Sequence, residues 1–160
     1  MTKNNFENLR IGHGIDYHNL IYKKNNIQPL GGIKFLIDYS IQAHSDGDII
    51  IHSISNAILG ALGIGDIGEW FSDREDKNIN LNSLEILEFA LKKCLNLNYK
   101  IINIDLTIIT DHIHMQDKKN QIKEFLEKFL NTSVNVKATR FENDNKQIKC
   151  CAVCLLVKNN

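Results

Sequence analysis

The chain has 160 residues, 43% of them hydrophobic and 24% charged, which suits one ordinary globular domain and excludes a disordered or fibrous protein. Nineteen basic and nineteen acidic residues give a net charge of zero, so we expect no non-specific nucleic-acid binding and a mild tendency to self-associate. No apolar run approaches the roughly 20 residues of a membrane helix, and the N-terminus lacks a secretory signal, so we expect a cytoplasmic protein without membrane contact. No linker or repeat divides the chain, and residues 1–160 are predicted to form a single domain.

The first third of the chain reads as two extended segments followed by a helix. Residues 8–18 form a predicted strand whose two glycines mark a place where another backbone or a ligand approaches closely. A second extended segment covers residues 29–42 and is broken by two further glycines. Apolar residues at helical spacing then continue to residue 62, with Ser45 or Asp46 as the expected N-cap and Gly63 as a stop signal.

The remainder alternates between helix and strand. A helix is predicted over 83–96, with Asn82 as its cap, and a strand with alternating apolar residues over 102–108. A third helix covers about 122–130, and strand-like runs at 134–140 and 148–157 read as a final hairpin. This order predicts an α+β fold, with a mixed β-sheet and helices packed on one face.

Three residues have the types and spacing of a metal site. Asp16 and His18 are two apart on a predicted strand and therefore project from the same face. His52, on the following helix, could supply a third ligand and complete a zinc site that keeps one position open for substrate. The alternative is a surface Asp-x-His pair beside an ordinary buried histidine, and spacing alone favours this alternative.

The segment from His44 to Asp48 directly precedes the helix. Its backbone N–H groups and the side chains of His44 and Ser45 could bind an anion. Helix capping alone explains Ser45 and Asp46, but not His44 or Asp48. We expect Asp48, one turn before His52, to orient that imidazole.

Three further motifs have ordinary structural explanations when taken alone. The glycine-rich segment 65–68 reads as a helix exit. Thr139, Arg140 and Glu142 could bind a diphosphate directly and through Mg²⁺, or could simply end a strand. Cys151 and Cys154 lie in an apolar strand and point to opposite sides, so we expect packed cysteines and not a zinc or redox pair.

Taken together and in order, the motifs resemble one enzyme family. GHGIDYH, GGIKF, AHSDGD, the run ILGALGIGDIG after His52, FSD and VNVKAT are similar to those of 2-C-methyl-D-erythritol 2,4-cyclodiphosphate synthases over residues 10–157. The resemblance implies a phosphorus–oxygen lyase of the non-mevalonate isoprenoid pathway. Its substrate is 4-diphosphocytidyl-2-C-methyl-D-erythritol 2-phosphate, whose 2-phosphate attacks the β-phosphorus to form the cyclic diphosphate and release CMP. Family members are homotrimers with active sites between subunits.

The resemblance also assigns roles to individual residues. Asp16, His18 and His52 would hold a divalent metal, usually Zn²⁺, and Glu142 would hold Mg²⁺ or Mn²⁺ on the diphosphate. The remaining roles concern substrate binding and catalysis. His44 and Ser45 would contact the methylerythritol phosphate, and His44 would also stabilise the transition state. Asp66 and Gly68 would contact the ribose, and Phe71 and Asp73 would line the methylerythritol side. Met115 would lie in the segment that encloses the cytosine, and Thr139 would contact a phosphate.

The chain also departs from the family pattern. Arg140 stands where the family has a catalytic threonine, and Asn56 replaces an aspartate one turn after His52. Ile113 and His114 replace a Pro-Lys pair, and the short NDNKQIK replaces a glycine-rich stretch after Glu142. Two alternatives therefore stay open: a weakly active family member that still binds metal, or a zinc-dependent phosphohydrolase acting on another metabolite.

Overall fold

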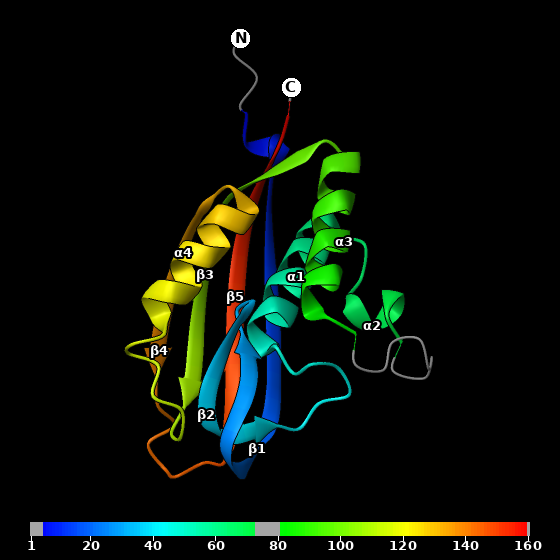
Figure 1. Cartoon of the computed structure of the whole chain (residues 1–160). Coiled ribbons are helices and arrows are strands. Elements are labelled where there is room, and N and C mark those ends of the chain that lie inside the picture. Colours follow the sequence, from blue (N-terminus) through cyan, green and yellow to red (C-terminus); the bar gives the residue numbers. More distant parts are fainter. Residues whose placement is uncertain (1–4, 73–80, 160) are drawn as a thin grey trace.

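Five strands form one mixed sheet, in the spatial order β2-β1-β5-β3-β4. The computed structural model describes residues 5–72 and 81–159 (Figure 1). A short 3₁₀ turn at Asn5–Asn8 leads into the first strand. In chain order the elements are β1 (Leu9–Leu30), β2 (Ile33–Ile41), α1 (Ile49–Leu62), α2 (Ile67–Trp70), α3 (Ser83–Asn96), β3 (Tyr99–Thr110), α4 (Lys119–Leu130), β4 (Ser133–Thr139) and β5 (Gln147–Lys158).

The last strand lies inside the sheet. β5 runs antiparallel to both of its neighbours, β1 and β3, whereas β4 pairs with β3 in parallel after the crossover through α4. The predicted mixed sheet is confirmed, but the predicted C-terminal hairpin is wrong. Alternating apolar residues identify a strand and its buried face, but they do not identify the strand with which it pairs.

The first strand is longer than its sequence pattern indicates. β1 continues without a break through residues 19–28 and pairs with β2, with a register shift between Tyr22 and Asn26. The turn between the strands is made by Gly31 and Gly32, whose φ angles are 64° and 83°. Glycine adopts such positive φ angles without steric cost. The hairpin curls toward the helices (Figure 1), and a Cβ added at Gly31 would lie 2.6 Å from Ile122 of α4.

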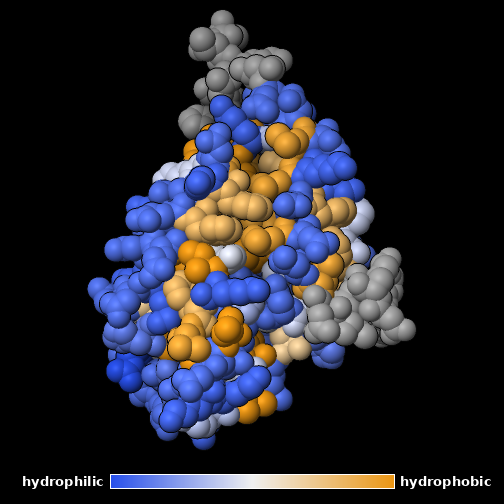
Figure 2. Space-filling model, viewed as in Figure 1, coloured by the Kyte–Doolittle hydropathy of each residue, from blue (hydrophilic) through white to orange (hydrophobic). Residues whose placement is uncertain are grey.

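Helices α1, α3 and α4 all lie on one side of the sheet, as predicted (Figure 1). Gly12 and Gly14 of β1 and the buried residues Cys150 and Cys154 of β5 face this side. Figure 2 views the same side and shows apolar side chains in the seam between α4 and the α1–α3 pair, framed by polar ones. No helix in the described part of the chain is long and apolar enough to span a membrane.

The opposite face of the sheet carries none of the helices in residues 5–72 and 81–159 and is rich in exposed apolar side chains. Ile11 is 73% exposed, Tyr17 65%, Ile15 43% and Val153 42%. Cys151 lies half-buried on this side, whereas Cys154 is buried on the other, so their predicted opposite orientation is confirmed. An uncovered apolar sheet face of this kind is typical of a surface that another chain covers.

Candidate active site

Asp16, His18 and His52 meet where β1 passes α1. Asp16 and His18 are two positions apart on the strand, and the Oδ1 atom of Asp16 lies 3.2 Å from Nε2 of His18. The other oxygen, Oδ2, lies 3.3 Å from Nδ1 of His52, which is on the first turn of α1. The structure therefore brings together the three residues that the sequence singles out as metal ligands.

The donor set of this cluster fits a divalent cation. Burial acts to raise the pKa of Asp16, but the contacts with His18 and His52 outweigh it and hold that pKa well below its ordinary value, so the carboxylate is charged. Its Oδ2 atom is buried and has no hydrogen-bond partner among the described residues. The imidazoles lie directly against the carboxylate. In the described ranges, no three His, Cys, Asp or Glu side chains are already arranged around a point where a metal ion would fit. Two imidazoles and one carboxylate beside a cavity are nevertheless a donor set typical of catalytic zinc sites.

Two glycines allow α1 to lie close enough to β1 for this cluster to form. A Cβ added at Gly14 would lie 2.0 Å from the carbonyl oxygen of Ser53, and one added at Gly12 would lie 1.8 Å from that of Ala57. Both positions therefore require glycine, because the helix backbone occupies the space of a side chain. The close backbone approach that the sequence predicts at these glycines is confirmed, and it places His52 beside Asp16.

The loop before α1 is fixed by the carboxylate of Asp48, which is the true N-cap. This carboxylate accepts hydrogen bonds from the backbone N–H groups of Ile50 and Ile51, at 3.2 and 3.1 Å. It also accepts from Gly31 and Gly32 in the β1–β2 turn, at 2.8 and 2.7 Å. The predicted N-cap at Ser45 or Asp46 is wrong by two to three residues. Asp48 cannot orient His52 as expected, because its oxygens already bind the backbone of two separate segments.

Ser45 takes over the role that the sequence suggested for Asp48. Its Oγ atom lies 3.4 Å from Nε2 of His52, the ring nitrogen that faces away from Asp16. A partner on the second nitrogen fixes the ring orientation of a metal-binding histidine. A buried side chain in β1, Gln28, supports the same loop: its amide donates to the carbonyl oxygen of Asp46 at 3.1 Å and accepts from Ile41 N–H at 3.1 Å.

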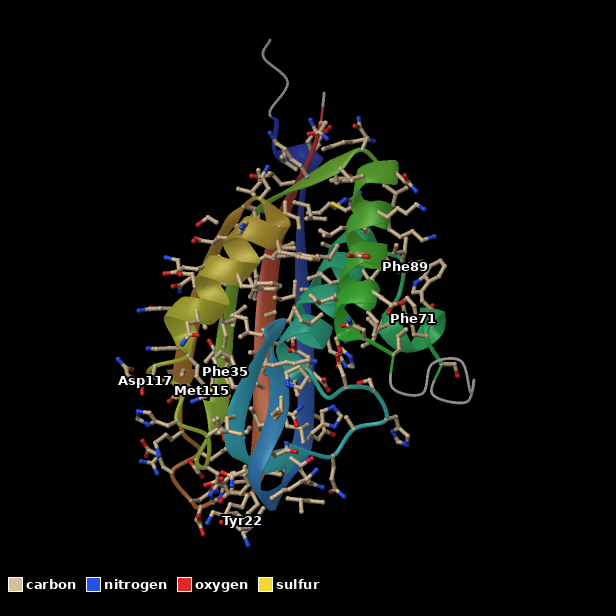
Figure 3. The ribbon with its side chains drawn as sticks, viewed as in Figure 1. Tyr22, Phe35, Phe71, Phe89, Met115 and Asp117 are labelled. Carbon is tan, nitrogen blue, oxygen red and sulfur yellow. The ribbon has the colours of Figure 1, made fainter. Side chains whose placement is uncertain are left out.

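A cavity of about 190 Å³ opens beside the cluster. His44 and Ser45 form one wall, and Gly68 and Phe71 form another. Asp66 does not line this cavity; it caps α2 by accepting from the N–H of Glu69. Figure 3 shows Phe71 facing Phe89 of α3, with ring centroids 5.1 Å apart. Asp73, which the resemblance places on the methylerythritol side, lies outside the described residues.

The remaining predicted residues line a second, separate depression of about 410 Å³. Thr139 and Arg140 form one side, and the segment from Thr110 to Gln116 forms the other. This segment includes the largely buried Met115, which is labelled in Figure 3. Arg140 and Glu142 do not share a strand face as expected, because β4 ends at Thr139 and Glu142 has a φ of 63° in the following turn.

The two groups of residues point away from each other within one chain. Asp16 is in register with Cys150 on the helix-bearing face, whereas Thr139 is in register with Ile109 on the bare face. Strands β5 and β3 separate them, a spacing of about 14 Å. The first cavity is smaller than the roughly 300–1,000 Å³ that is usual for a small-molecule site, whereas the second lies within that range. One chain therefore carries two separate depressions on opposite faces of the sheet, named here the first and the second half-site.

Comparison with known proteins shows the class to which this fold and site belong. Residues 9–157 match the model of the YgbB family. The chain is 40% identical to 2-C-methyl-D-erythritol 2,4-cyclodiphosphate synthase of Mycoplasmoides gallisepticum, over 95% of this chain and 99% of that protein. It is 39% identical to the synthase of the same name from Leptospira borgpetersenii, over 94% and 98% of the two chains.

Solved structures agree with the sequence comparison. The Plasmodium falciparum protein IspF, in a complex with CDP, superposes with a TM-score of 0.83 at 32% identity and covers 99% of this chain and 100% of its own. The chain belongs to the YgbB family, the family of the 2-C-methyl-D-erythritol 2,4-cyclodiphosphate synthases. This confirms the family resemblance of the sequence motifs.

Two residues that organise the site have roles that the sequence does not reveal. Asn56 accepts a hydrogen bond from the N–H of Ile67 at 2.9 Å and so joins α1 to α2, rather than acting at the cluster of Asp16, His18 and His52. Asp111 binds backbone groups about 30 residues away in the turn that carries Glu142. Both act on distant backbone atoms, which a sequence pattern does not reveal.

Proposed function

We propose that the protein cyclises 4-diphosphocytidyl-2-C-methyl-D-erythritol 2-phosphate to 2-C-methyl-D-erythritol 2,4-cyclodiphosphate and releases CMP, acting as a phosphorus–oxygen lyase. An oxygen of the 2-phosphate forms a bond to the β-phosphorus, and the bond from that phosphorus to the bridging oxygen breaks, so that CMP leaves with this oxygen. No water is consumed. The observation that carries the proposal is the full-length match to the synthase family together with the cluster of Asp16, His18 and His52 in a cavity.

The reaction requires mainly a folded substrate and neutralised phosphate charge, because its nucleophile is part of the substrate. Asp16, His18 and His52 would hold Zn²⁺, which supplies charge stabilisation at the phosphates when bound. His44 and Ser45 line the same cavity and can donate hydrogen bonds to a phosphate of the substrate. Ser45 also keeps the His52 ring in place.

The second half-site would bind the diphosphate and the cytosine. Glu142 would carry Mg²⁺ or Mn²⁺, since a carboxylate on an exposed turn suits a hard cation shared with phosphate oxygens. Thr139 and Arg140 line the depression beside this turn and can bind phosphate oxygens, and the segment that includes Met115 would enclose the base. Asp66, Gly68 and Phe71, near the first cavity, would contact the ribose and the methylerythritol.

The site is complete only if two copies of the chain combine, so we include a homotrimer in the proposal. The bare apolar face of the sheet, with Ile11 and Tyr17 the most exposed of its residues named above, supports an interface between copies. Zero net charge adds little repulsion. Light scattering should give three times the 18.3 kDa mass of the chain. A monomer mass with full activity would contradict the proposal.

Phosphorus NMR of the reaction products separates this function from its rivals. Purified protein with the cytidyl substrate, Zn²⁺ and Mg²⁺ should give CMP and the cyclic diphosphate in equal amounts. A linear phosphate product would indicate a hydrolase, and bound metal without turnover would indicate a degenerate family member. The free, mostly buried cysteines suit a reducing cytoplasmic location.

A further inference from the structure

A buried carboxylate, that of Asp111, binds the turn between β4 and β5 at three backbone N–H groups. Asp111, which directly follows β3, has only 3% of its side chain exposed. Its Oδ1 atom accepts from the N–H of Phe141 at 2.8 Å and of Glu142 at 3.2 Å. Its Oδ2 atom accepts from the N–H of Asn145 at 2.8 Å. Both carboxylate oxygens are therefore engaged by the same short turn.

This turn needs such support because of its backbone conformation. Glu142 and Asp144 have φ angles of 63° and 54°, in the left-handed region that residues other than glycine rarely adopt. The N–H groups that donate to Asp111 belong to Glu142 itself and to the residues on either side of Glu142 and Asp144, namely Phe141 and Asn145. Strained backbone persists only where its surroundings fix it, and it concentrates at functional positions. The Asp111 carboxylate is the group that fixes it here.

Asp111 also joins the two walls of the second half-site. It belongs to the segment that lines one side of the depression, and it binds the turn that continues from Thr139 and Arg140 on the other. Nε of Arg140 lies 3.8 Å from Oδ1 of Asp111. The neighbouring His112 adds a weaker contact, since its Nε2 lies 3.4 Å from the carboxylate of Asp144.

We propose that Asp111 is a positioning residue for the cyclisation, which fixes the backbone of residues 141–145 so that the Glu142 carboxylate is presented to the diphosphate. Asp111 acts through backbone N–H groups and does not touch the substrate. This inference rests on the proposed role of Glu142. Without Asp111, the turn samples conformations in which Glu142 is misplaced, while the cluster of Asp16, His18 and His52 is unaffected.

The test compares Asp111→Ala and Asp111→Asn with the matched control Asp117→Asn. Asp117 lies just beyond the same segment, and its side chain is 80% exposed and lies 3.9 Å from Nε2 of His114. We expect the Asp111 variants to lower the kcat of CMP release at least tenfold, with unchanged bound zinc. Hydrogen exchange at the amides of Phe141 and Asn145 should quicken at least tenfold. The control should change neither property more than twofold.

A double-mutant cycle with Glu142→Ala shows whether Asp111 acts through Glu142. In the Glu142→Ala background, Asp111→Ala should cause no further loss of kcat, because the carboxylate that it positions is already gone. Additive losses, or Asp111 variants as active as the parent, would overturn the inference. If Asp111→Ala does not fold, Asp111→Asn carries the cycle. Failure of the proposed function is distinguishable, because the parent would then release no CMP.

Discussion

Replacing Gly14 with alanine should both destabilise the protein and disrupt the cluster of Asp16, His18 and His52. The added Cβ would lie 2.0 Å from the carbonyl oxygen of Ser53 and 2.7 Å from the N–H nitrogen of Ala57, whereas ordinary contact begins at 3.4 Å. Strand and helix must therefore separate by more than 1 Å. Because both contacted atoms belong to the backbone of α1, no side-chain rotation can relieve the overlap. Ser53 is adjacent to His52, so the same movement draws His52 away from Asp16.

Overpacking of this kind typically costs about 1–3 kcal/mol, and because the contacts are with backbone atoms, we expect Gly14→Ala to cost about 3 kcal/mol. At about 2–4 °C per kcal/mol for a chain of this size, the melting temperature should fall by roughly 6–12 °C. Zinc retained after dialysis should fall as well. Gly60→Ala is the matched control, since its Cβ would meet only the carbonyl oxygen of His13, at 3.8 Å. Because alanine favours the helix interior over glycine, Gly60→Ala should raise the free energy of unfolding by about 0.5–1 kcal/mol. The reasoning fails if Gly14→Ala melts within 2 °C of the parent.

Three further predictions follow from the site and the sheet. His52→Ala should remain folded but bind much less zinc and release little CMP, and normal zinc content would exclude His52 as a ligand. Burial raises the pKa of the Cys94 and Cys154 thiols to about 11 and about 12, so at pH 8 only about one in 1,000 or fewer is the reactive thiolate. A thiol reagent should therefore label Cys151 first in separated chains and leave it protected in the proposed trimer. Labelling of Cys94 or Cys154 in folded protein would contradict this. Arg140→Ala and Arg140→Thr should each lower kcat/KM by roughly 10- to 150-fold, the loss of one charge-assisted contact, whereas unchanged rates would make Arg140 a solvated residue.

The elements with strong periodicity could be predicted from the sequence, but their partners could not. α3 is observed at Ser83–Asn96 with Asn82 as its cap, as the apolar spacing and the cap residue indicate. The pairing of β5 between β1 and β3 joins residues 128–148 positions apart on the β1 side and 38–59 positions apart on the β3 side. No local pattern encodes such a pairing.

Similar limits apply to the site. Asp16 and His18 could be recognised because strand geometry alone places them on one face, and the glycines of β1 marked the close approach of α1. The N-cap of α1 could not be located, since Ser45, Asp46 and Asp48 are all suitable cap residues. Only the position of the β1–β2 turn selects Asp48, whose carboxylate binds both segments.

The central claim is that each active site combines the cluster of Asp16, His18 and His52 from one chain with the turn of Glu142 from another. Co-refolding equal amounts of His52→Ala and Glu142→Ala chains tests it directly. Each variant alone should be inactive. In a randomly mixed ring, a site is intact only when its first half-site comes from a Glu142→Ala chain and its second from a His52→Ala chain. Each condition is met with a probability of about one half, so about one quarter of the sites are intact. The account predicts about a quarter of the parent rate of CMP release from the mixture. A mixture that assembles but stays as inactive as its components would contradict it.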